Sequence, residues 1–481
     1  MWLIRDIVRI ILLVASEIYS LLTNCRDFRE LEQGIFRMVQ RISVEILAAG
    51  LRQIDNKLME ERDKSRLRYI NTKTRTLVTP FGAIEIKRRY YRDESTGERK
   101  FLLDETLGIE GCKRLSPWMR ELAVKASVEM PYKRAAQFLS TMTLGAIDLR
   151  NMTLWQEVQE AGKELAKEAE EKKSLLFEYG VIPEGKLKAS SLNIEADEVY
   201  VKGRNGKRHA IKIGIGYEGK RETGKDRREL TERRVVSGIK ESDSFWEELV
   251  AEISEHWKLW EVDEFYLGGD GAKWIKEGCE YFPRAVYRLD PYHLRRTLLE
   301  GLGHDEEGLI EAWEAIKEED LEKLNQTLLV AEKRAKGAKK NRVKAVKKYL
   351  NNNWEGICHS KAGVRLGAIE GQVFHHIARR MKRHGAGWSE QGADHLARLL
   401  AKKANGELSE ALKAKWKTKP EVIKRLVGEK KPFIDADVLI GAKDYGEWLR
   451  TTMPVLYGPA QSAPWVKYIM RYLVQELPRI A

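Results

Sequence analysis

Five apolar segments between residues 192 and 289 constrain the fold of this chain most strongly. Three follow one another, at 192–201, 209–217 and 232–239. A helix-like segment at 244–257 then precedes a fourth, and a short helical stretch near 273–276 precedes the fifth; these two lie at 262–267 and 285–289. Alternating polarity and β-branched residues predict strands, and strands separated by helices pair in parallel. The order therefore predicts a mixed sheet flanked by helices.

Three acidic residues lie at suggestive places in this order, which is that of the ribonuclease H-like fold. Asp197 lies in the first strand, Asp270 follows the fourth strand in a glycine-rich turn, and Glu370 lies on a later helix. A carboxylate in an apolar strand is costly unless it binds a cation or a hydrogen-bond donor. Two strand acids and a distant helix acid predict a site for two divalent ions, Mg²⁺ or Mn²⁺, that serves phosphodiester chemistry.

Other acids compete for these roles. Glu195 and Glu198 flank Asp197, and alternation predicts that Glu195 shares its face of the strand while Glu198 takes the opposite face. Glu355 and Glu390 are alternatives to Glu370, and spacing alone does not separate Glu390 from Glu370.

Asp290 and His293 close the fifth strand in the sequence Asp290-Pro291-Tyr292-His293. An acid and a histidine three residues apart at a strand-to-helix junction can orient a phosphate or bind metal. The same Asp, followed by Pro, also suits the N-cap of the next helix, and the two roles are compatible.

The charge balance indicates an anionic partner. Lys and Arg number 86 against 73 acids, a net charge of +13, and nucleic acid is the first candidate. Four scattered cysteines without a CxxC pair fit a reducing compartment and exclude a zinc knuckle. The apolar stretch at 1–22 is interrupted by charges, and its uncharged run is too short to cross a bilayer. It therefore predicts an amphipathic helix that packs on a partner or on the body.

Changes of pattern along the chain predict seven regions. One of these regions resembles a helix-turn-helix DNA reader. It consists of a helix that breaks at Pro131, a short helix, a turn and a third helix from Asn151 to Gln159, and a linker helix follows it. The regions are an N-terminal helical and oligomerisation region (1–70), a β-hairpin element (71–110), the helix-turn-helix-like region with its linker helix (111–182), the first part of the catalytic core (183–293), an all-α insertion (294–355), the last part of the core (356–400) and a C-terminal helical region (401–481).

Basic residues in several of these regions are candidate contacts to the DNA backbone. They lie on the second hairpin strand, on the short helix after Pro131, in the basic run of the insertion and on the helix after Glu370. The candidates are Arg88, Arg89, Lys133, Arg134, Lys339, Lys340, Arg379, Arg380 and Arg383.

Taken together, these motifs resemble the ISLre2 family of bacterial insertion-sequence transposases, over most of the chain and in order. The points of match are Ile194-Glu195-Ala196-Asp197, Gly268-Gly269-Asp270-Gly271, Asp290-Pro291-Tyr292-His293, Ala368 to Val373 with Arg379-Arg380-Met381, Gly385 to Ser389, and Thr79-Pro80-Phe81-Gly82. Asp290 and His293 also fit a motif of the related Mutator-type transposases, and the helical block after His293 resembles their all-α insertion.

The resemblance implies Asp197, Asp270 and Glu370 as a DDE triad in a ribonuclease H-like core that uses two divalent ions. It implies double-stranded DNA with terminal inverted repeats as the substrate, action as a homo-oligomer, and a cytoplasmic, nucleoid-associated protein without a membrane partner. Three readings remain as alternatives: a ribonuclease H-like nuclease or resolvase without strand transfer, a catalytically silent DNA-binding protein, and a structural or membrane-associated protein directed by residues 1–22.

Overall fold

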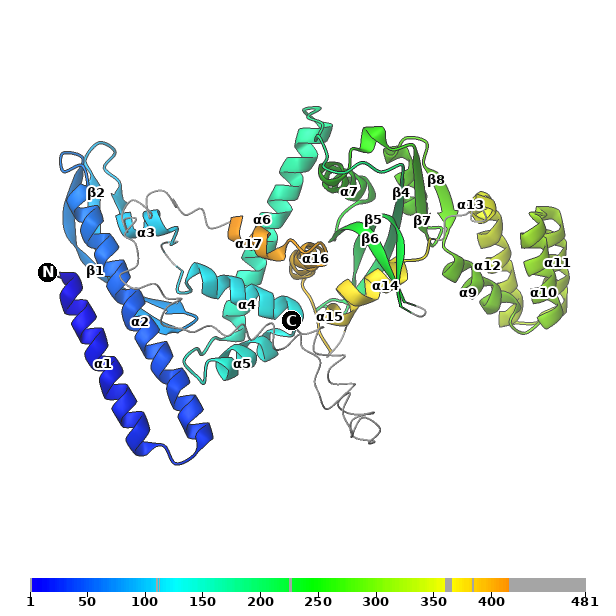
Figure 1. The fold of residues 1–481 in the computed structure, drawn as a ribbon. Helices are drawn as coiled ribbons and strands as arrows, with labels where there is room; N and C mark the ends of the chain where they lie inside the picture. The colour runs from blue at the N-terminus through cyan, green and yellow to red at the C-terminus, as the bar shows by residue number, and fades with distance from the viewer. Residues whose placement is uncertain are drawn as a thin grey trace, which may run out of the picture. The chain divides into compact units, whose positions relative to one another are not determined.

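A five-stranded mixed sheet organises the described part of the chain, which in this computed structural model covers residues 2–109, 111, 113–224, 227–359, 366–382 and 385–414 (Figure 1). The strand order is β6-β5-β4-β7-β8. β4 (Ser191–Lys202) is central and pairs antiparallel with β5 (Arg208–Gly224), which pairs antiparallel with β6 (Arg227–Gly238). On the other side of β4, β7 (Glu264–Gly269) and β8 (Val286–Leu289) continue the sheet in parallel. The mixed α/β class predicted from the sequence is confirmed.

The two faces of β4 pack against different helices. Leu192, Ile194 and Ala196 share an apolar cluster with α7 (Ser242–His256). Val199 and Val201 belong to a second cluster with α16 (Glu390–Ala404). Because side chains alternate along a strand, Glu195 and Asp197 lie on the α16 side of the sheet.

The α16 side also receives the segment from Ile369 to Met381. This segment is continuous helix, formed by α14 (Ile369–Gln372), a π-helical stretch η3 (Val373–Ala378) and α15 (Arg379–Met381). Ile369, Ile377 and Met381 bury themselves in the same cluster as Val199 and Val201. The predicted helix around Glu370 is thus present and packs on β4.

Helices occupy the chain between β8 and this segment. They are α9 (Pro291–Leu302), α10 (Glu306–Glu318), α11 (Leu321–Arg334), α12 (Ala338–Asn352) and α13 (Trp354–His359). Apolar residues of α9 to α13 form a cluster of their own, which includes Leu289 of β8. Short elements complete the core: η1 (Leu259–Glu261), α8 (Lys273–Glu277) and η2 (Gly278–Tyr281) around β7, and α17 (Leu408–Ala414) after α16.

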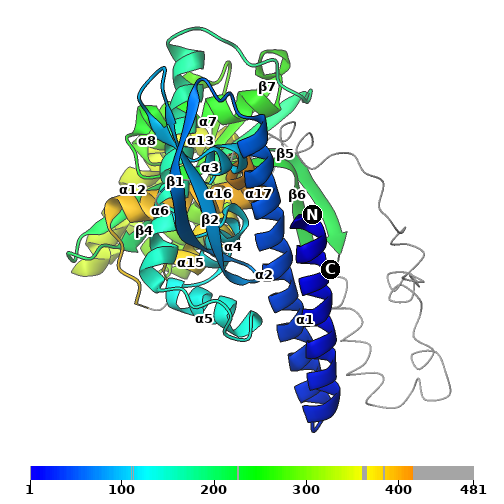
Figure 2. The same cartoon turned by 90° about the vertical axis from the view of Figure 1, so that its left-hand side faces the viewer.

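The N-terminal region pairs two long helices with a small sheet. α1 (Trp2–Asn24) runs beside α2 (Phe28–Glu61), as Figure 2 shows. β1 (Leu67–Thr79), β2 (Gly82–Asp93) and β3 (Arg99–Lys100) form an antiparallel sheet, followed by α3 (Leu102–Leu107). Thr79 pairs with Gly82 across the turn, and Gly82 has φ 135°, a value that favours glycine. The predicted hairpin is confirmed, with longer strands than expected.

Three helices follow, and one of them differs from the prediction. α4 (Pro117–Glu129) begins at the cap Ser116, and Pro131 separates it from α5 (Tyr132–Met142). α6 (Asn151–Phe177) is one helix, where the sequence predicted a helix to Gln159 and a separate linker helix. Gly162 lies against the backbone of His395, so it permits close packing of α16 rather than a break.

The C-terminal region predicted at 401–481 is described only as far as residue 414. Among the described helices, none combines the length and the apolar character needed to span a membrane.

Candidate functional site

Parallel pairing of β4 and β7 brings Asp197 and Asp270 to the same edge of the sheet. Glu195 of β4 pairs with Gly268 of β7. Asp197 lies two residues after Glu195, and Asp270 lies two residues after Gly268, just past the end of β7. The Asp270 carboxylate accepts a hydrogen bond from the Ala272 N–H at 2.9 Å. Gly271, with φ 92°, allows the sharp turn that places this carboxylate at the strand end.

Asp290 and His293 join the same edge from β8. Asp290 is 1% exposed, caps α9 through the Tyr292 N–H at 3.1 Å, and donates its own N–H to the Gly269 carbonyl at 2.9 Å. Its Oδ2 lies 3.0 Å from His293 Nδ1. This hydrogen bond raises the pKa of His293 above its ordinary value; burial opposes the rise, and the charges of Asp290, Asp197 and Asp270 support it.

Glu370 reaches this group from the helical segment on the α16 side. Its Oε1 lies 3.8 Å from His293 Nε2, and its side chain is 45% exposed. The pKa of Asp197 is raised to about 6 by burial first, with the charges of Asp270 and Glu370 adding to the rise. The Glu198 N–H, 2.7 Å from Asp197 Oδ1, and the charge of His293 act in the opposite direction. Asp197, Asp270, Asp290, His293 and Glu370 therefore share one electrostatic field.

The structure assigns a different place to each competing acid. Glu198 points to the other face of β4, where it accepts from the Tyr200 hydroxyl at 2.8 Å and lies 3.8 Å from Lys212. Glu355 is exposed on α13. Glu390 is exposed at the start of α16, close to Trp388, which forms a β-bridge with Gly203. Gly203 follows Asp197 by six residues, which corresponds to about 20 Å at the rise of an extended strand, so Glu390 is remote from Asp197.

Glu195 is fully buried and its carboxylate is engaged by donors from elsewhere in the chain. It accepts N–H groups of Gly367 at 2.9 Å, Ala368 at 2.9 Å and Ile369 at 3.1 Å, together with the Tyr217 hydroxyl at 2.5 Å. Because these donors occupy its carboxylate oxygens, Glu195 does not compete with Asp197 as a ligand, although both lie on the same face of β4.

Two tyrosines behind the site were not predicted from the sequence. The Tyr349 hydroxyl of α12 donates to the Asp270 carbonyl at 2.5 Å, and the Tyr287 hydroxyl of β8 donates to the Gly269 carbonyl at 3.3 Å. Asn353 lies against Gly271. These contacts fix the backbone of the turn that carries Asp270. Their partners are distant in sequence, so local pattern does not reveal them.

The donor chemistry of the site suits a hard divalent cation, since all three predicted ligands are carboxylates. The clustering of their charges, which raises the pKa of Asp197, is of the kind that a bound cation relieves. Across the described ranges, however, no three His, Cys, Asp or Glu side chains are gathered closely enough to surround an ion. The side chain of Glu370, the third predicted ligand, is 45% exposed.

The predicted DNA contacts differ in how far they are exposed. Lys133, Arg134, Lys339, Lys340 and Arg379 are exposed. Arg88 is buried and pairs with Asp104, and Arg380 is buried with its guanidinium donating to the Ser127 carbonyl at 2.9 Å, so neither presents its charge to a partner here. Arg89 is partly exposed and pairs with Asp55 at 2.6 Å. Arg383 lies outside the described residues.

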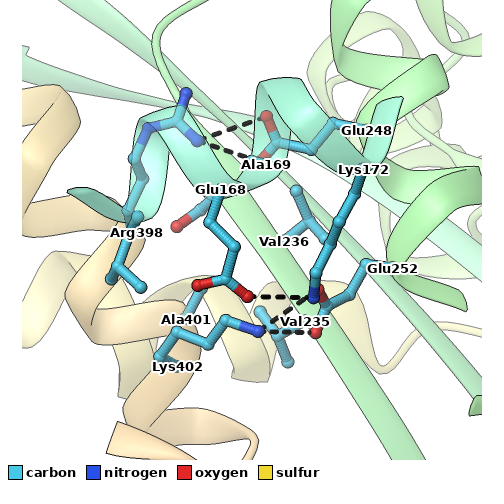
Figure 3. A pocket seen from close by; sticks show the side chains of 12 residues that line it. Glu168, Ala169, Lys172, Val235, Val236, Glu248, Glu252, Arg398, Ala401 and Lys402 are labelled. Atoms are coloured by element: carbon cyan, nitrogen blue, oxygen red, sulfur yellow. Dashed lines mark hydrogen bonds and ion pairs between the residues drawn. The ribbon is translucent and has the colours of Figure 1, made fainter. Parts of the chain in front are cut away.

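A separate group of charges lines a small pocket between α6, α7, β6 and α16 (Figure 3). Lys402 contacts Glu252 at 2.9 Å, and Lys172 contacts Glu168 at 3.1 Å and Glu252 at 3.8 Å. Arg398 donates to Glu248 at 3.0 Å. Cations and carboxylates balance one another here, so we assign this pocket to the packing of the helices.

Comparison with known proteins places the chain in a family. A family model described as an uncharacterised protein family, UPF0236, matches residues 21–419. A UPF0236 protein of Caldanaerobacter subterraneus subsp. tengcongensis is 27% identical over 393 residues, which cover 80% of each chain. A UPF0236 protein of Streptococcus gallolyticus is 27% identical over 406 residues, covering 82% of this chain and 86% of the relative. The chain belongs to the UPF0236 family.

Proposed function

We propose that this chain is the DDE-type transposase of a bacterial insertion sequence, similar to the ISLre2 family. The observation that carries the proposal is the convergence of Asp197, Asp270 and Glu370 with the Asp290–His293 pair. These residues come from β4, β7, α14 and the start of α9, and the charges of both other acids raise the pKa of Asp197. One acid with a strongly raised pKa within a cluster of charged groups is a mark of functional sites.

The sheet supports a ribonuclease H-like core. Three antiparallel strands followed by two parallel ones, with helices on both faces, is the arrangement that this fold requires. The helices between β8 and Glu370 take the place expected for an all-α insertion.

The names of the relatives add independent support. One name joins eleven numbered designations from a single organism, and another from the same organism joins four. The streptococcal relative is named for its position in the 3′ region of vanSb. One protein recurring at many positions in a genome is what a self-mobilising element produces.

Asp197, Asp270 and Glu370 would hold two Mg²⁺ or Mn²⁺ ions. When bound, such ions supply a water activated for attack on a phosphodiester and stabilise the leaving 3′ oxygen. The protein's own part is positional: the Ala272 N–H orients the Asp270 carboxylate, and the Glu198 N–H orients that of Asp197. Asp290 orients the His293 ring through the contact of its Oδ2 with Nδ1 at 3.0 Å. His293 Nε2 then faces the place that a scissile phosphate would occupy beside Glu370.

The substrate we propose is double-stranded DNA: the inverted repeats at the element's ends and a target site. The net charge of +13 and the exposed bases Lys133, Arg134, Lys339, Lys340 and Arg379 support an anionic polymer as partner. We further propose that the chain works as a homo-oligomer in the cytoplasm, associated with the nucleoid.

Cleavage of the element's ends tests the proposal. Purified wild-type protein with Mg²⁺ or Mn²⁺ should nick a labelled duplex that contains the gene's flanking inverted repeat. Asp197→Asn should lower that rate roughly a thousandfold while DNA binding stays unchanged, since the carboxylate acts in chemistry rather than in affinity. Glu198→Gln, on the other face of the same strand, is the matched control and should cleave like wild type.

Two outcomes would replace the proposal. Cleavage without joining of pre-nicked ends to a target plasmid would indicate a nuclease or resolvase. Binding without metal-dependent nicking in the wild type would indicate a silent DNA-binding protein. Full cleavage by Asp197→Asn would remove the acid from its role.

A further inference from the structure

The helical segment that carries Glu370 is fastened to the sheet by one buried carboxylate. Glu195 is 0% exposed and lies on β4 two residues before Asp197, on the same face. Its Oε2 accepts the N–H groups of Gly367 at 2.9 Å, Ala368 at 2.9 Å and Ile369 at 3.1 Å. Its Oε1 accepts the Ala368 N–H at 3.1 Å and the Tyr217 hydroxyl at 2.5 Å.

The three N–H donors lie at the start of the helix that runs from Ile369 to Met381, where N–H groups have no acceptor within the helix itself. An ionised carboxylate at such a terminus gains both from the hydrogen bonds and from the helix dipole. Acids usually cap a helix from its own first turn, whereas Glu195 does so from a strand 172 residues earlier. The contact therefore sets the position of the helix relative to β4.

Neighbouring residues fit around this contact. A Cβ at Gly268 would meet Leu366 at 2.8 Å and Glu195 Cγ at 3.1 Å, so only glycine leaves room for both. Gly367 has φ 99° and lies against Asp290 Oδ1. Lys220 donates to the Leu366 carbonyl at 3.3 Å. The segment before Glu370 is thus held by β4, β5 and the Asp290 cap together.

We propose that Glu195 is a positioning residue for the third acid: its carboxylate fixes the start of the helix and so places Glu370 beside Asp197 and His293. This inference rests on the proposed function, because it assigns Glu195 to the same site. Glu195 itself has no free oxygen directed at a ligand, which distinguishes it from the acids that it supports.

Glu195→Gln tests the proposal, because glutamine keeps the shape but offers one acceptor oxygen and turns an NH₂ group toward N–H donors. Amide hydrogen exchange should accelerate about tenfold or more in peptides covering 366–372, and stay unchanged in α7. Binding of Mn²⁺ alone, measured by calorimetry, should weaken about tenfold, and half-maximal cleavage should need correspondingly more Mn²⁺ at unchanged DNA affinity. A role confined to folding would not shift the Mn²⁺ requirement of the folded fraction.

Two further variants make the test decisive. Tyr217→Phe removes one donor without touching the charge and should shift exchange and Mn²⁺ binding in the same direction by a smaller factor; it also serves if Glu195→Gln does not fold. Glu229→Gln, at an acid of β6 that is 61% exposed and lies outside the site, should match wild type in every arm. Unchanged exchange at 366–372, or faster exchange with wild-type Mn²⁺ binding, would overturn the proposal.

The arms also separate this inference from the proposed function. If the wild type binds Mn²⁺ but cleaves no DNA, the transposase assignment falls, while exchange and Mn²⁺ binding still decide the role of Glu195. If the wild type binds no Mn²⁺, both fall.

Discussion

Without a bound cation, the ionised Asp197 carboxylate lowers the stability of the folded protein. Its pKa is raised from 3.8 to about 6, chiefly by burial and then by the charges of Asp270 and Glu370. An acid whose pKa is higher in the folded state costs stability once the pH exceeds its unfolded pKa. A shift of this size corresponds to on the order of 3 kcal/mol at neutral pH. A buried acid kept at such a cost is better explained by function than by stability.

Asp197→Asn should therefore stabilise the protein in metal-free buffer. The amide resembles the protonated acid and keeps the bond from the Glu198 N–H, so we expect the free energy of unfolding at pH 7.5 to rise by on the order of 1–3 kcal/mol. The gain should fade as the pH falls from about 6 to 4, where the wild-type acid becomes protonated in both states. Urea unfolding at several pH values measures this. A variant less stable than wild type at pH 7.5 would contradict it.

At the packing of α6, α7 and α16, by contrast, a buried acid supports the fold. Burial raises the pKa of Glu252, but the charges of Lys402 and Lys172 outweigh it, so the net pKa is lowered. Both lysines are mostly buried, at 17% and 23% exposure. Glu252 on α7, Lys172 on α6 and Lys402 on α16 thus tie the three helices together (Figure 3).

Glu252→Gln should destabilise the protein by on the order of 3 kcal/mol at pH 7, because it leaves two partly buried ammonium groups short of a counter-charge. Since the folded pKa lies below 4.5, the stabilisation is present above about pH 4.5 and is lost as the pH falls through the folded value. The difference from wild type should shrink accordingly in thermal unfolding at low pH. Glu255→Gln is the control: the Glu255 side chain is itself 43% exposed where it contacts Lys172, so its loss should cost less than about 1 kcal/mol.

The elements were predictable where periodicity is local. The cores of β4 to β8, α7 and the hairpin of β1 and β2 follow from alternation and turn residues. β5 and β6 run further than predicted because their outer halves are charged, as in the pair Arg221–Glu229 at 3.5 Å, and pair through the backbone without an apolar pattern. α6 is longer than predicted because Gly162 meets a helix from the far end of the chain.

The site was predictable only as a set of residue types. Parallel pairing of two strands brings Asp197 and Asp270 together, and that follows from strand order. Glu370 could be preferred to Glu390 only through its likeness to a family, since the tie that places it, from Glu195 to Gly367, spans 172 residues. Arg88 and Arg380 were expected on the surface, and both are buried because tertiary partners for a guanidinium cannot be read from local sequence.

The paired helices α1 and α2 leave a large apolar surface uncovered. Among the side chains that the structure describes, seven large apolar ones of α1 and five of α2 are exposed, including Ile11 at 61% and Leu22 at 76%. On α1, Val8, Ile11, Ala15, Ile18 and Leu22 recur with alternating steps of three and four, the spacing of a coiled-coil seam. Another side of α1 already packs on α2, so apolar side chains cover two sides of the helix. An exposed apolar surface of this size is typical of an interaction site.

A second copy of this chain is the occupant we expect. Two helix pairs meeting at this seam would form a four-helix bundle with the same surface contributed by each copy. A stable interface of this kind buries roughly 800 Å² per partner. Full-length protein should therefore sediment as a dimer or larger assembly. Ile11→Glu with Ile18→Glu places two charges in the seam and should weaken self-association about a hundredfold or more, with unchanged circular dichroism.

Leu299→Glu with Ile310→Glu alters side chains that are equally exposed, at 47% and 54%, on α9 and α10, and should leave the assembly intact. The contrast tests position rather than loss of surface apolarity. Wild type that sediments as a monomer, or a seam variant that still dimerises, would contradict a helix-mediated assembly. Flotation of the wild type, but not the seam variant, with phospholipid vesicles would instead assign the seam to lipid. The substituted positions, Ile11 and Ile18, lie far in sequence from Asp197. Cleavage of a single DNA end should therefore persist in the seam variant, while steps that need both DNA ends together should be lost.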